Sequence, residues 1–239
     1  MRKAINRVLK LYCKFRLKSK LPGIESKLSQ YGTASETTGT QWITLWMAVS
    51  EIFKHKPLNI LESGTGASTI VLAEAIRVLQ RQDSRYKAQI ISMESVQKWY
   101  QIAKENLPED YSDIVQIVYG PRERIELSIF RGYVHQNIPD RPYDFFFIDG
   151  PNFEDQHGTT FCADMLFVAQ RTGERKVRGV IDGRTSSAFV LQTLFGVSSA
   201  RYFIPNMACR FHFNSGRLHT SFKSTDFSNG LTGRLTLKI

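Results

Sequence analysis

Residues 60–69 read Ile-Leu-Glu-Ser-Gly-Thr-Gly-Ala-Ser-Thr, and this stretch decides the fold of the chain. A short apolar run that begins at Leu58 ends here in a polar pair and two closely spaced glycines, Gly64 and Gly66. Apolar residues at helical spacing follow over 70–79. Glycine lets the backbone approach a ligand closely, and the free N–H groups of a helix beginning near Ser68 suit a carboxylate or phosphate. The stretch therefore predicts a strand, a ligand-binding turn and a helix.

The same alternation of strands and helices extends on both sides of this stretch. Strands are expected at 58–61, 88–93, 114–118, 143–148 and 177–181. Helices are expected at 42–53, from about 68 to 79, at 99–107, within about 122–136 and within about 158–169. Such alternation is typical of a parallel sheet with helices on both faces. The predicted fold class is therefore α/β, with a Rossmann-like, doubly wound and mostly parallel sheet.

The C-terminal part of the chain has a β pattern. Strand-like segments occur at 200–205, 208–213, 218–222 and 231–239, with a hairpin turn expected at 214–216. We expect residues 41–239 to form the main domain, with a β extension over about 200–239. Residues 1–40 would then form a separate N-terminal segment.

The net charge of the chain is concentrated in that N-terminal segment. The chain has 239 residues and a formal charge of +10, which at first suggests an anionic partner. Residues 1–20 contain eight basic residues and no acidic one, so only +2 remains for residues 21–239. A nearly neutral body argues against a nucleic-acid-binding domain. No apolar run approaches the roughly 20 residues that a membrane-spanning helix needs.

Residues 1–20 predict a basic amphipathic helix that stops at Leu21-Pro22-Gly23. Its apolar residues at helical spacing are Ile5, Val8, Leu9, Tyr12 and Phe15. Two interpretations stay open: the helix packs this apolar face on the main domain, or it makes a peripheral contact with an anionic membrane or a partner. The polar residues 31–40 are expected to form a linker or lid.

The cysteines indicate a reducing compartment. Cys13, Cys162 and Cys209 are odd in number, far apart in the sequence and form no CxxC pair. We therefore expect a cytoplasmic protein, which would dock at a membrane surface under the second interpretation of residues 1–20.

Acidic residues end the predicted strands, and the carboxyl ends of parallel strands share one edge of the sheet. Glu62, Glu94, Asp149 and Asp182 hold these positions. Glu94 lies 28 residues after Gly66, where a carboxylate can accept hydrogen bonds from the two hydroxyls of a ribose. A glycine turn after the first strand and an acid after the second together predict an adenosyl-type ligand.

Three of these segments resemble motifs of the class I S-adenosylmethionine-dependent methyltransferases. Residues 60–69 look like the first motif of that superfamily, and Ser92-Met-Glu94 and residues 143–150 look like its second-strand and fourth-strand motifs. The resemblance covers about residues 57–183. It implies a seven-stranded sheet with an antiparallel C-terminal portion and S-adenosylmethionine as cofactor. It also implies that Glu62, Gly64 and Gly66 hold the methionine part, Glu94 the ribose, and that Asp149 lies near the sulfonium.

The methyl acceptor is expected to be a hydroxyl of a small molecule or a glycan. The NPPY-like motif of methyltransferases that act on base amines is absent, because the fourth strand ends in Asp149-Gly-Pro-Asn152. A hydroxyl acceptor must lose its proton, and Asp149 and His157 are the candidate bases. Magnesium-dependent O-methyltransferases place carboxylates where Asp149 and Asp182 stand, so the resemblance implies a candidate magnesium site at these two residues. This chain has Gly183 where those enzymes have an amide residue, which argues against the metal.

Two alternative functions stay open. A NAD(P)-dependent oxidoreductase has the same fold class, but its fingerprint has a third glycine where this chain has Thr69. A non-catalytic methyltransferase-like domain could instead be recruited to a membrane or complex by residues 1–20. Arg184 follows the fifth strand, where it could pair with an anionic acceptor, but we expect an ordinary surface arginine.

Overall fold

The computed structural model describes residues 2–34, 41–127, 130–150, 154–156, 158–171, 175–204 and 208–215. Seven strands form the main sheet: β1 (Asn59–Ser63), β2 (Gln89–Glu94), β3 (Val115–Tyr119), β6 (Phe145–Ile148), β10 (Lys176–Ile181), β11 (Ala200–Ile204) and β12 (Ala208–Asn214). Their order across the sheet is β11-β12-β10-β6-β1-β2-β3. The five strands from β3 to β10 are parallel, whereas β12 is antiparallel to both β10 and β11. The predicted fold class is confirmed.

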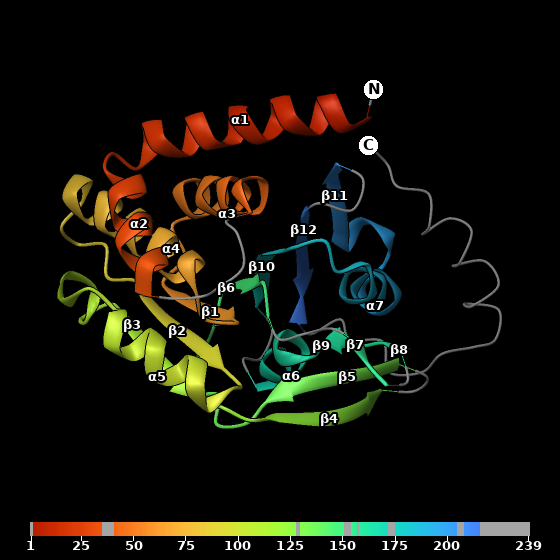
Figure 1. Cartoon of the computed structure of the whole chain (residues 1–239). Helices are drawn as coiled ribbons and strands as arrows, with labels where there is room; N and C mark the ends of the chain where they lie inside the picture. The colour runs from red at the N-terminus through yellow and green to blue at the C-terminus, as the bar shows by residue number, and fades with distance from the viewer. Residues whose placement is uncertain are drawn as a thin grey trace.

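Helices and short strands connect and cover this sheet, as Figure 1 shows. The α-helices are α1 (Arg2–Lys20), α2 (Ile24–Ala34), α3 (Trp42–His55), α4 (Ala67–Gln82), α5 (Gln97–Asn106), α6 (Asp164–Arg171) and α7 (Thr185–Phe195). Two single 3₁₀ turns occur at η1 (Glu109–Tyr111) and η2 (Val197–Ser199). Of the strand-like C-terminal segments, 200–205 and 208–213 correspond to β11 and β12, and those at 218–222 and 231–239 lie outside the described residues.

The strands form two separate cores because their side chains alternate between the two faces of the sheet. On β6, Phe145 and Phe147 belong to a core shared with α1–α4, whereas Phe146 and Ile148 belong to a core shared with α6 and α7. All four side chains are fully buried. This continuous burial is typical of a central parallel strand.

The helix expected within about 122–136 is wrong, because this segment is a β-hairpin. The hairpin consists of β4 (Arg122–Leu127) and β5 (Phe130–His135), and β5 also pairs with β9 (Phe161–Cys162). Gly132 fits this arrangement, since a Cβ there would lie 2.7 Å from the ring of Phe161. The hairpin contributes Val134 to the second core. Strand pairing, with the Phe161 ring packed on the backbone of Gly132, therefore outweighs the helical pattern of the segment.

The helix expected within about 158–169 begins later than predicted, at Asp164. The residues before it form β9 and the short strand β8 (Gly158–Thr159), which pairs with β7 (Glu154–Asp155). Phe161 and Cys162 are in register with Gly132 and Tyr133 of β5, so their backbone groups are used in a strand ladder instead of a helix.

The N-terminal region is more regular than expected. Helix α1 ends at Lys20 as predicted, but α2 extends into the segment interpreted as a linker and includes Tyr31. Ile24 and Tyr31 are buried in the first core, and Leu28 is partly buried there. These three residues have helical spacing, but the many polar residues around them make the pattern hard to recognise in the sequence. Residues 35–40, the remainder of the expected lid, lie outside the described residues.

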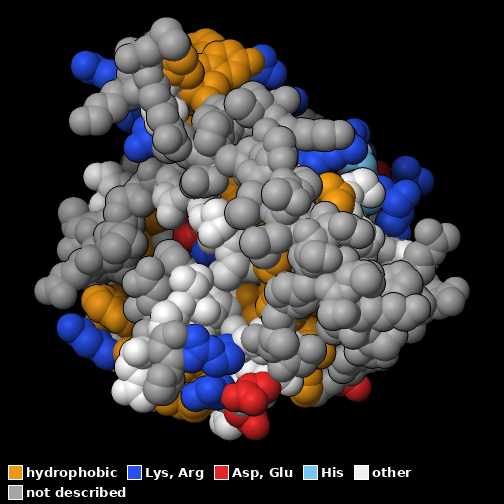
Figure 2. Space-filling view, turned by 90° about the vertical axis from the view of Figure 1, so that its right-hand side faces the viewer, with side chains coloured by type: hydrophobic (Ala, Val, Ile, Leu, Met, Phe, Trp, Pro, Cys, Tyr) orange, Lys and Arg blue, Asp and Glu red, His pale blue; other side chains and the backbone are white. Residues whose placement is uncertain are grey.

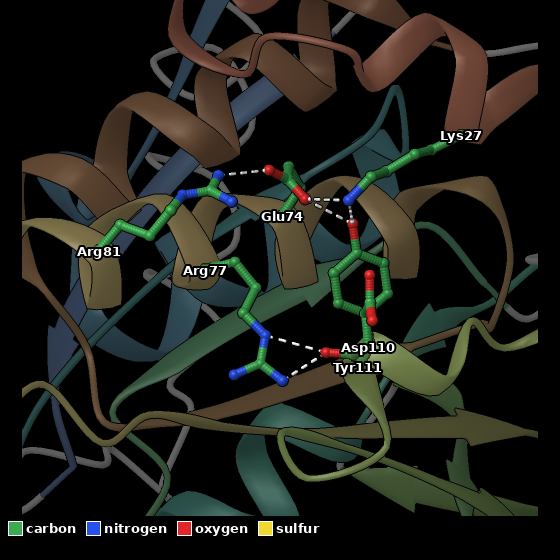
Figure 3. Close-up of polar contacts among 6 residues, drawn as sticks. All are labelled: Lys27, Glu74, Arg77, Arg81, Asp110 and Tyr111. Carbon is green, nitrogen blue, oxygen red and sulfur yellow. Dashed lines mark hydrogen bonds and ion pairs between the residues drawn. The ribbon is translucent and has the colours of Figure 1, made fainter. Parts of the chain in front are cut away.

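A buried carboxylate fastens α2 to α4 (Figure 3). Glu74 of α4 is only 2% exposed, and its Oε2 accepts hydrogen bonds from Lys27 Nζ of α2 and from the Tyr111 hydroxyl, each at 2.6 Å. Its Oε1 accepts a hydrogen bond from Arg81 at 2.7 Å. Burial by itself raises the pKa of Glu74, but these three donors outweigh it and lower the pKa. The ionised carboxylate thus links α2 to the domain.

Cys13, Cys162 and Cys209 are all buried and free. Among the helices of the described segments, none combines the length and the apolar character that crossing a membrane requires.

Candidate active site

The acidic residues that end the strands lie along one edge of the sheet. Glu62 ends β1 together with Ser63, Glu94 ends β2, and Asp149 and Asp182 follow β6 and β10. Because these four strands are parallel neighbours, their carboxyl ends and the start of α4 lie at the same edge. This is the edge at which open α/β sheets bind ligands.

The two glycines of the first turn have different surroundings. Gly64 has a φ of +97°, and a Cβ at this position would lie 2.5 Å from the Cα of Gly150. It therefore allows the turn after β1 to pack against the turn after β6. Gly66 has an extended φ of 173°, and a Cβ there would meet nothing within 4 Å. Open space thus lies beside Gly66, immediately before α4.

Glu62 is fully buried and held by hydroxyl groups. Its Oε2 accepts hydrogen bonds from Thr69 Oγ1 and Ser92 Oγ, each at 2.6 Å. Its Oε1 has no hydrogen-bond partner among the residues described by the structure. Burial raises the pKa of Glu62 to about 7, and the nearby hydroxyls lower it only in part. The free oxygen can therefore accept a hydrogen bond from a ligand cation.

Thr69 has a specific role in this turn, at the position where a dinucleotide fingerprint has glycine. Its hydroxyl donates to Glu62 and accepts the backbone N–H of Gly66 at 3.1 Å. A glycine there would remove both contacts. Thr69, which stands where the dinucleotide fingerprint has glycine, thus holds the Glu62 side chain in place.

Glu94 lies one strand away and is 9% exposed. Its Oε1 accepts the backbone N–H of Val96 at 2.8 Å, which fixes the carboxylate at the end of β2. Burial raises the pKa of Glu94, against the effect of backbone donors and of the charges of His135 and Arg122. The carboxylate is thus at the edge where the sequence places a ribose-binding acid.

Asp149 and Asp182 form a second pair of carboxylates. Asp149 is half-buried, and burial together with the negative charge of Asp182 raises its pKa above its ordinary value. Asp182 Oδ1 accepts a hydrogen bond from Arg184 Nε at 2.8 Å. The expectation of a surface arginine is wrong: Arg184 is 5% exposed because it neutralises this buried carboxylate. Gln41, just before α3, donates from Nε2 to Asp149 Oδ1 at 3.4 Å.

These residues do not complete a site for a divalent metal. Across the described segments, no cluster of three or more His, Cys, Asp or Glu side chains has the geometry of a metal site. Asp182 is already paired with Arg184, and Gly183 supplies no ligand from its side chain. The residues present therefore do not fit the magnesium expected at Asp149 and Asp182. His157, the other candidate base, lies outside the described residues.

A further buried cluster lies directly behind the first turn. Asp164 Oδ2 accepts a hydrogen bond from Ser63 Oγ at 2.5 Å and lies 2.7 Å from His135 Nδ1. The other oxygen, Oδ1, accepts a hydrogen bond from the backbone N–H of His135 at 2.8 Å. Sequence reasoning missed this cluster because His135 and Asp164 both lie in segments that were interpreted as helices. The Nε2 of His135 is buried without a hydrogen-bond partner among the described residues.

Tyr31 is a second residue that sequence reasoning missed. It is 5% exposed, and burial followed by the charges of Glu62 and Glu94 raises its pKa to about 12. Helix α2 therefore brings an aromatic hydroxyl to the side of the site that these two carboxylates occupy. The only sequence signal was its spacing from Ile24 and Leu28.

Comparison with known proteins identifies the fold. No protein-family model matches the sequence, and no curated protein matches it. Among solved structures, the SAH-bound methyltransferase PaMTH1 of Podospora anserina is similar with a TM-score of 0.50 at 16% identity, over 79% of this chain and 73% of that chain. A SAM-dependent methyltransferase from Aquifex aeolicus gives 0.41 at 11% identity, over 74% and 99% of the two chains. Human methyltransferase-like protein 13 in complex with SAH gives 0.38 at 14%, over 81% and 86%.

The similarity to PaMTH1 supports a conclusion about the fold. Together with the strand order and the antiparallel β12, it shows that the chain has the Rossmann-like methyltransferase fold. At 16% identity the similarity concerns the fold, so the activity has to be argued from the site itself.

Proposed function

We propose that this protein is an S-adenosylmethionine-dependent methyltransferase that acts on a hydroxyl group of a small molecule or a glycan. The observation that carries the proposal is the arrangement of two buried carboxylates, Glu62 and Glu94, at neighbouring strand ends beside the open turn at Gly66. One carboxylate suits an ammonium group and the other suits the hydroxyls of a ribose. An adenosyl amino acid carries both groups.

The residues that would hold the cofactor divide between its two ends. Glu62, with one free oxygen, would accept a hydrogen bond from the amino group of the methionine part, and the turn from Gly64 to Gly66 would let the backbone approach it. Glu94 would accept hydrogen bonds from the ribose. The hydroxyl of Tyr31 would bound the cofactor on the side of α2. When bound, the cofactor supplies an electrophilic methyl group on a sulfonium.

Asp149 would be the group that removes the proton of the acceptor hydroxyl. A base works best when its pKa is near the working pH, and burial and the charge of Asp182 raise the pKa of Asp149 from its ordinary acidic value in that direction. Arg184 neutralises Asp182 and thereby limits this increase, and Gln41 orients one oxygen of Asp149. His157 is the alternative base on the sequence pattern alone. Positioning of the acceptor would supply much of the remaining rate enhancement.

The rival oxidoreductase is less well supported by the turn. A dinucleotide site uses a glycine at the position of Thr69 to pack helix against strand, whereas Thr69 here donates to Glu62. The buried Glu62 also places a negative charge beside the turn, where a pyrophosphate would bind. Both features favour a cofactor with a cationic end.

A methyl-transfer assay tests the catalytic part of the proposal. The full-length protein would be incubated with S-adenosylmethionine carrying a labelled methyl group and with pools of phenols, sugars and glycans. We expect label in a product that is stable to mild base, as an ether is, and no label with Asp149→Asn. Transfer only to amines or carboxylates would contradict the hydroxyl acceptor, while leaving the cofactor assignment intact.

A further inference from the structure

Helix α1 has two apolar faces, and only one of them packs on the protein. Cys13 and Leu17 are fully buried against the layer that contains α3, and Leu9 is partly buried there. Four of the five residues that the sequence suggested as the packing face point elsewhere, because the helix is apolar on more than one side. Figure 1 shows α1 as the outermost layer, above α3.

The second face is an exposed apolar stripe. Its side chains and their exposed fractions are Ile5 (55%), Val8 (67%), Leu11 (60%), Tyr12 (50%) and Phe15 (69%). Ile5, Val8, Tyr12 and Phe15 recur every three or four positions, and Leu11 lies three positions after Val8, so all five share one side of the helix. The other exposed large apolar side chains among the described residues, Leu58, Val96, Phe167 and Val197, are scattered singly, and each is at most 49% exposed. The stripe is therefore a continuous feature of α1 and calls for an explanation.

Basic side chains flank the stripe. Arg7, Lys10, Arg16, Lys18 and Lys20 are exposed on α1, and residues 1–20 include no acidic residue. Figure 2 shows apolar side chains gathered at the top of the molecule with Lys and Arg beside them. Glu25 of α2 pairs with Lys14 and Lys18, toward the C-terminal end of the helix. Arg7 and Lys10 lie in the sequence between Ile5 and Leu11, and neither makes an ion pair within the described segments.

We propose that this stripe is a docking surface for an anionic lipid bilayer. The apolar side chains would enter the boundary between headgroups and acyl chains, while the flanking Arg and Lys side chains contact the acidic headgroups. A second copy of the chain is a poorer occupant, since two such helices would bring eight basic residues each into contact without any acid. A nucleic acid would satisfy the charges but leave the apolar stripe uncovered. The inference is independent of the proposed function.

The position of α1 gives such docking a structural consequence. Helix α1 packs on α3, and α3 begins next to Gln41, which contacts Asp149. A bilayer bound to α1 would thus lie one helical layer from the candidate active site. Under the proposed function, on which this consequence alone rests, the arrangement suits an acceptor that is itself at the membrane surface.

Vesicle co-sedimentation of the full-length protein tests the proposal. The vesicles would be phosphatidylcholine with phosphatidylserine, and phosphatidylcholine alone. Two double variants separate the contributions: Val8→Ser with Phe15→Ser removes apolar surface, and Arg7→Gln with Lys10→Gln removes charge. Exposed residues elsewhere supply matched controls, Val197→Ser for the first and Arg85→Gln with Lys87→Gln for the second. Circular dichroism would verify that each variant is folded.

We expect sedimentation with the anionic vesicles only, weakened by added salt. Each double variant in α1 should reduce the partition coefficient about tenfold or more, and the controls should leave it unchanged. Absence of sedimentation of the wild-type protein would overturn the proposal, as would equal sedimentation of the α1 variants. So would a wild-type dimer in analytical ultracentrifugation that Val8→Ser with Phe15→Ser converts to a monomer, because the stripe would then bind a second copy.

Discussion

His135 and Asp164 are joined by a buried contact of 2.7 Å between Nδ1 and Oδ2, which connects β5 to the first turn of α6. Their side chains are 1% and 0% exposed. Asp164 also accepts the hydroxyl of Ser63, so the contact fixes the hairpin and α6 to the end of β1. A pair of residues 29 positions apart thus supports the turn on which the candidate cofactor site is built.

Replacement of Asp164 by Asn should destabilise the protein. Burial raises the pKa of Asp164, but His135 and Ser63 outweigh burial and lower it. A carboxylate with a lowered pKa stabilises the fold above its unfolded pKa, and this contribution is lost as the pH falls. We therefore expect Asp164→Asn to lose about 3 kcal/mol in urea unfolding at neutral pH, and less at acidic pH. The exposed Asp140→Asn is the control, and an equal unfolding midpoint for both variants would show that the contact contributes nothing.

Glu74 allows a test that is local to α2. Replacement by Gln leaves Lys27 without its carboxylate, and we expect a loss of about 2 kcal/mol, since Lys27 and Arg81 remain partly solvated. Because the pKa of Glu74 is lowered, the difference from wild type should shrink as the pH falls toward the pKa of an unfolded Glu. Hydrogen exchange should accelerate in α2 more than in β1. Uniform acceleration throughout the chain, or none, would argue against a specific fastening of α2; the exposed Glu109→Gln serves as control.

Glu62 is predicted to reduce the stability of the ligand-free protein. Its pKa of about 7 lies above that of an unfolded Glu, so the folded state holds the proton more tightly and loses stability as the pH rises from about 4.5 to 7. Glu62→Gln should therefore unfold at a higher temperature than wild type at pH 8, by the equivalent of about 1–2 kcal/mol. The same variant should bind S-adenosylhomocysteine more weakly. A less stable Glu62→Gln protein at pH 8 would contradict this account of the buried carboxylate.

The two glycines of the turn should respond differently to replacement by Ala. Gly64→Ala places a Cβ against Gly150 at a positive φ, so we expect a loss of about 2–3 kcal/mol in unfolding free energy. Gly66→Ala meets open space at an extended φ and should change stability by less than about 0.5 kcal/mol. Gly66→Ala should instead increase the dissociation constant of S-adenosylhomocysteine. Comparable stability losses for both variants would show that Gly66 serves the fold instead of a ligand.

The sequence predicted the sheet and the acids at its edge because both depend on local patterns. Buried strands read as short apolar runs, and the residue that ends a parallel strand lies at the common edge whatever the rest of the fold does. Glu62, Glu94, Asp149 and Asp182 were therefore placed correctly along the chain. Their roles with a ligand stay predictions.

The remaining features depend on contacts that local patterns do not carry. Residues 122–135 alternate charged and apolar side chains in a way that also fits a helix. The pairing of β4 with β5 and of Gly132 with Phe161 decides for strands, and local sequence does not show these pairings. The contact of His135 with Asp164 could not be predicted once both segments were assigned to helices. Helix α1 is apolar on two sides, so its sequence does not say that Leu17 is buried while Phe15 is exposed.

Calorimetric titration of S-adenosylhomocysteine into the folded, full-length protein tests the central claim most directly. Wild type and the exposed control Glu105→Ala should bind with equal affinity, and Glu94→Ala should bind at least about tenfold more weakly, since hydrogen bonds to a charged carboxylate contribute about 1.5–3 kcal/mol. Absence of binding to wild type at high micromolar ligand would contradict the methyltransferase proposal. Binding that Glu94→Ala leaves unchanged would contradict the assignment of Glu94 to the ribose.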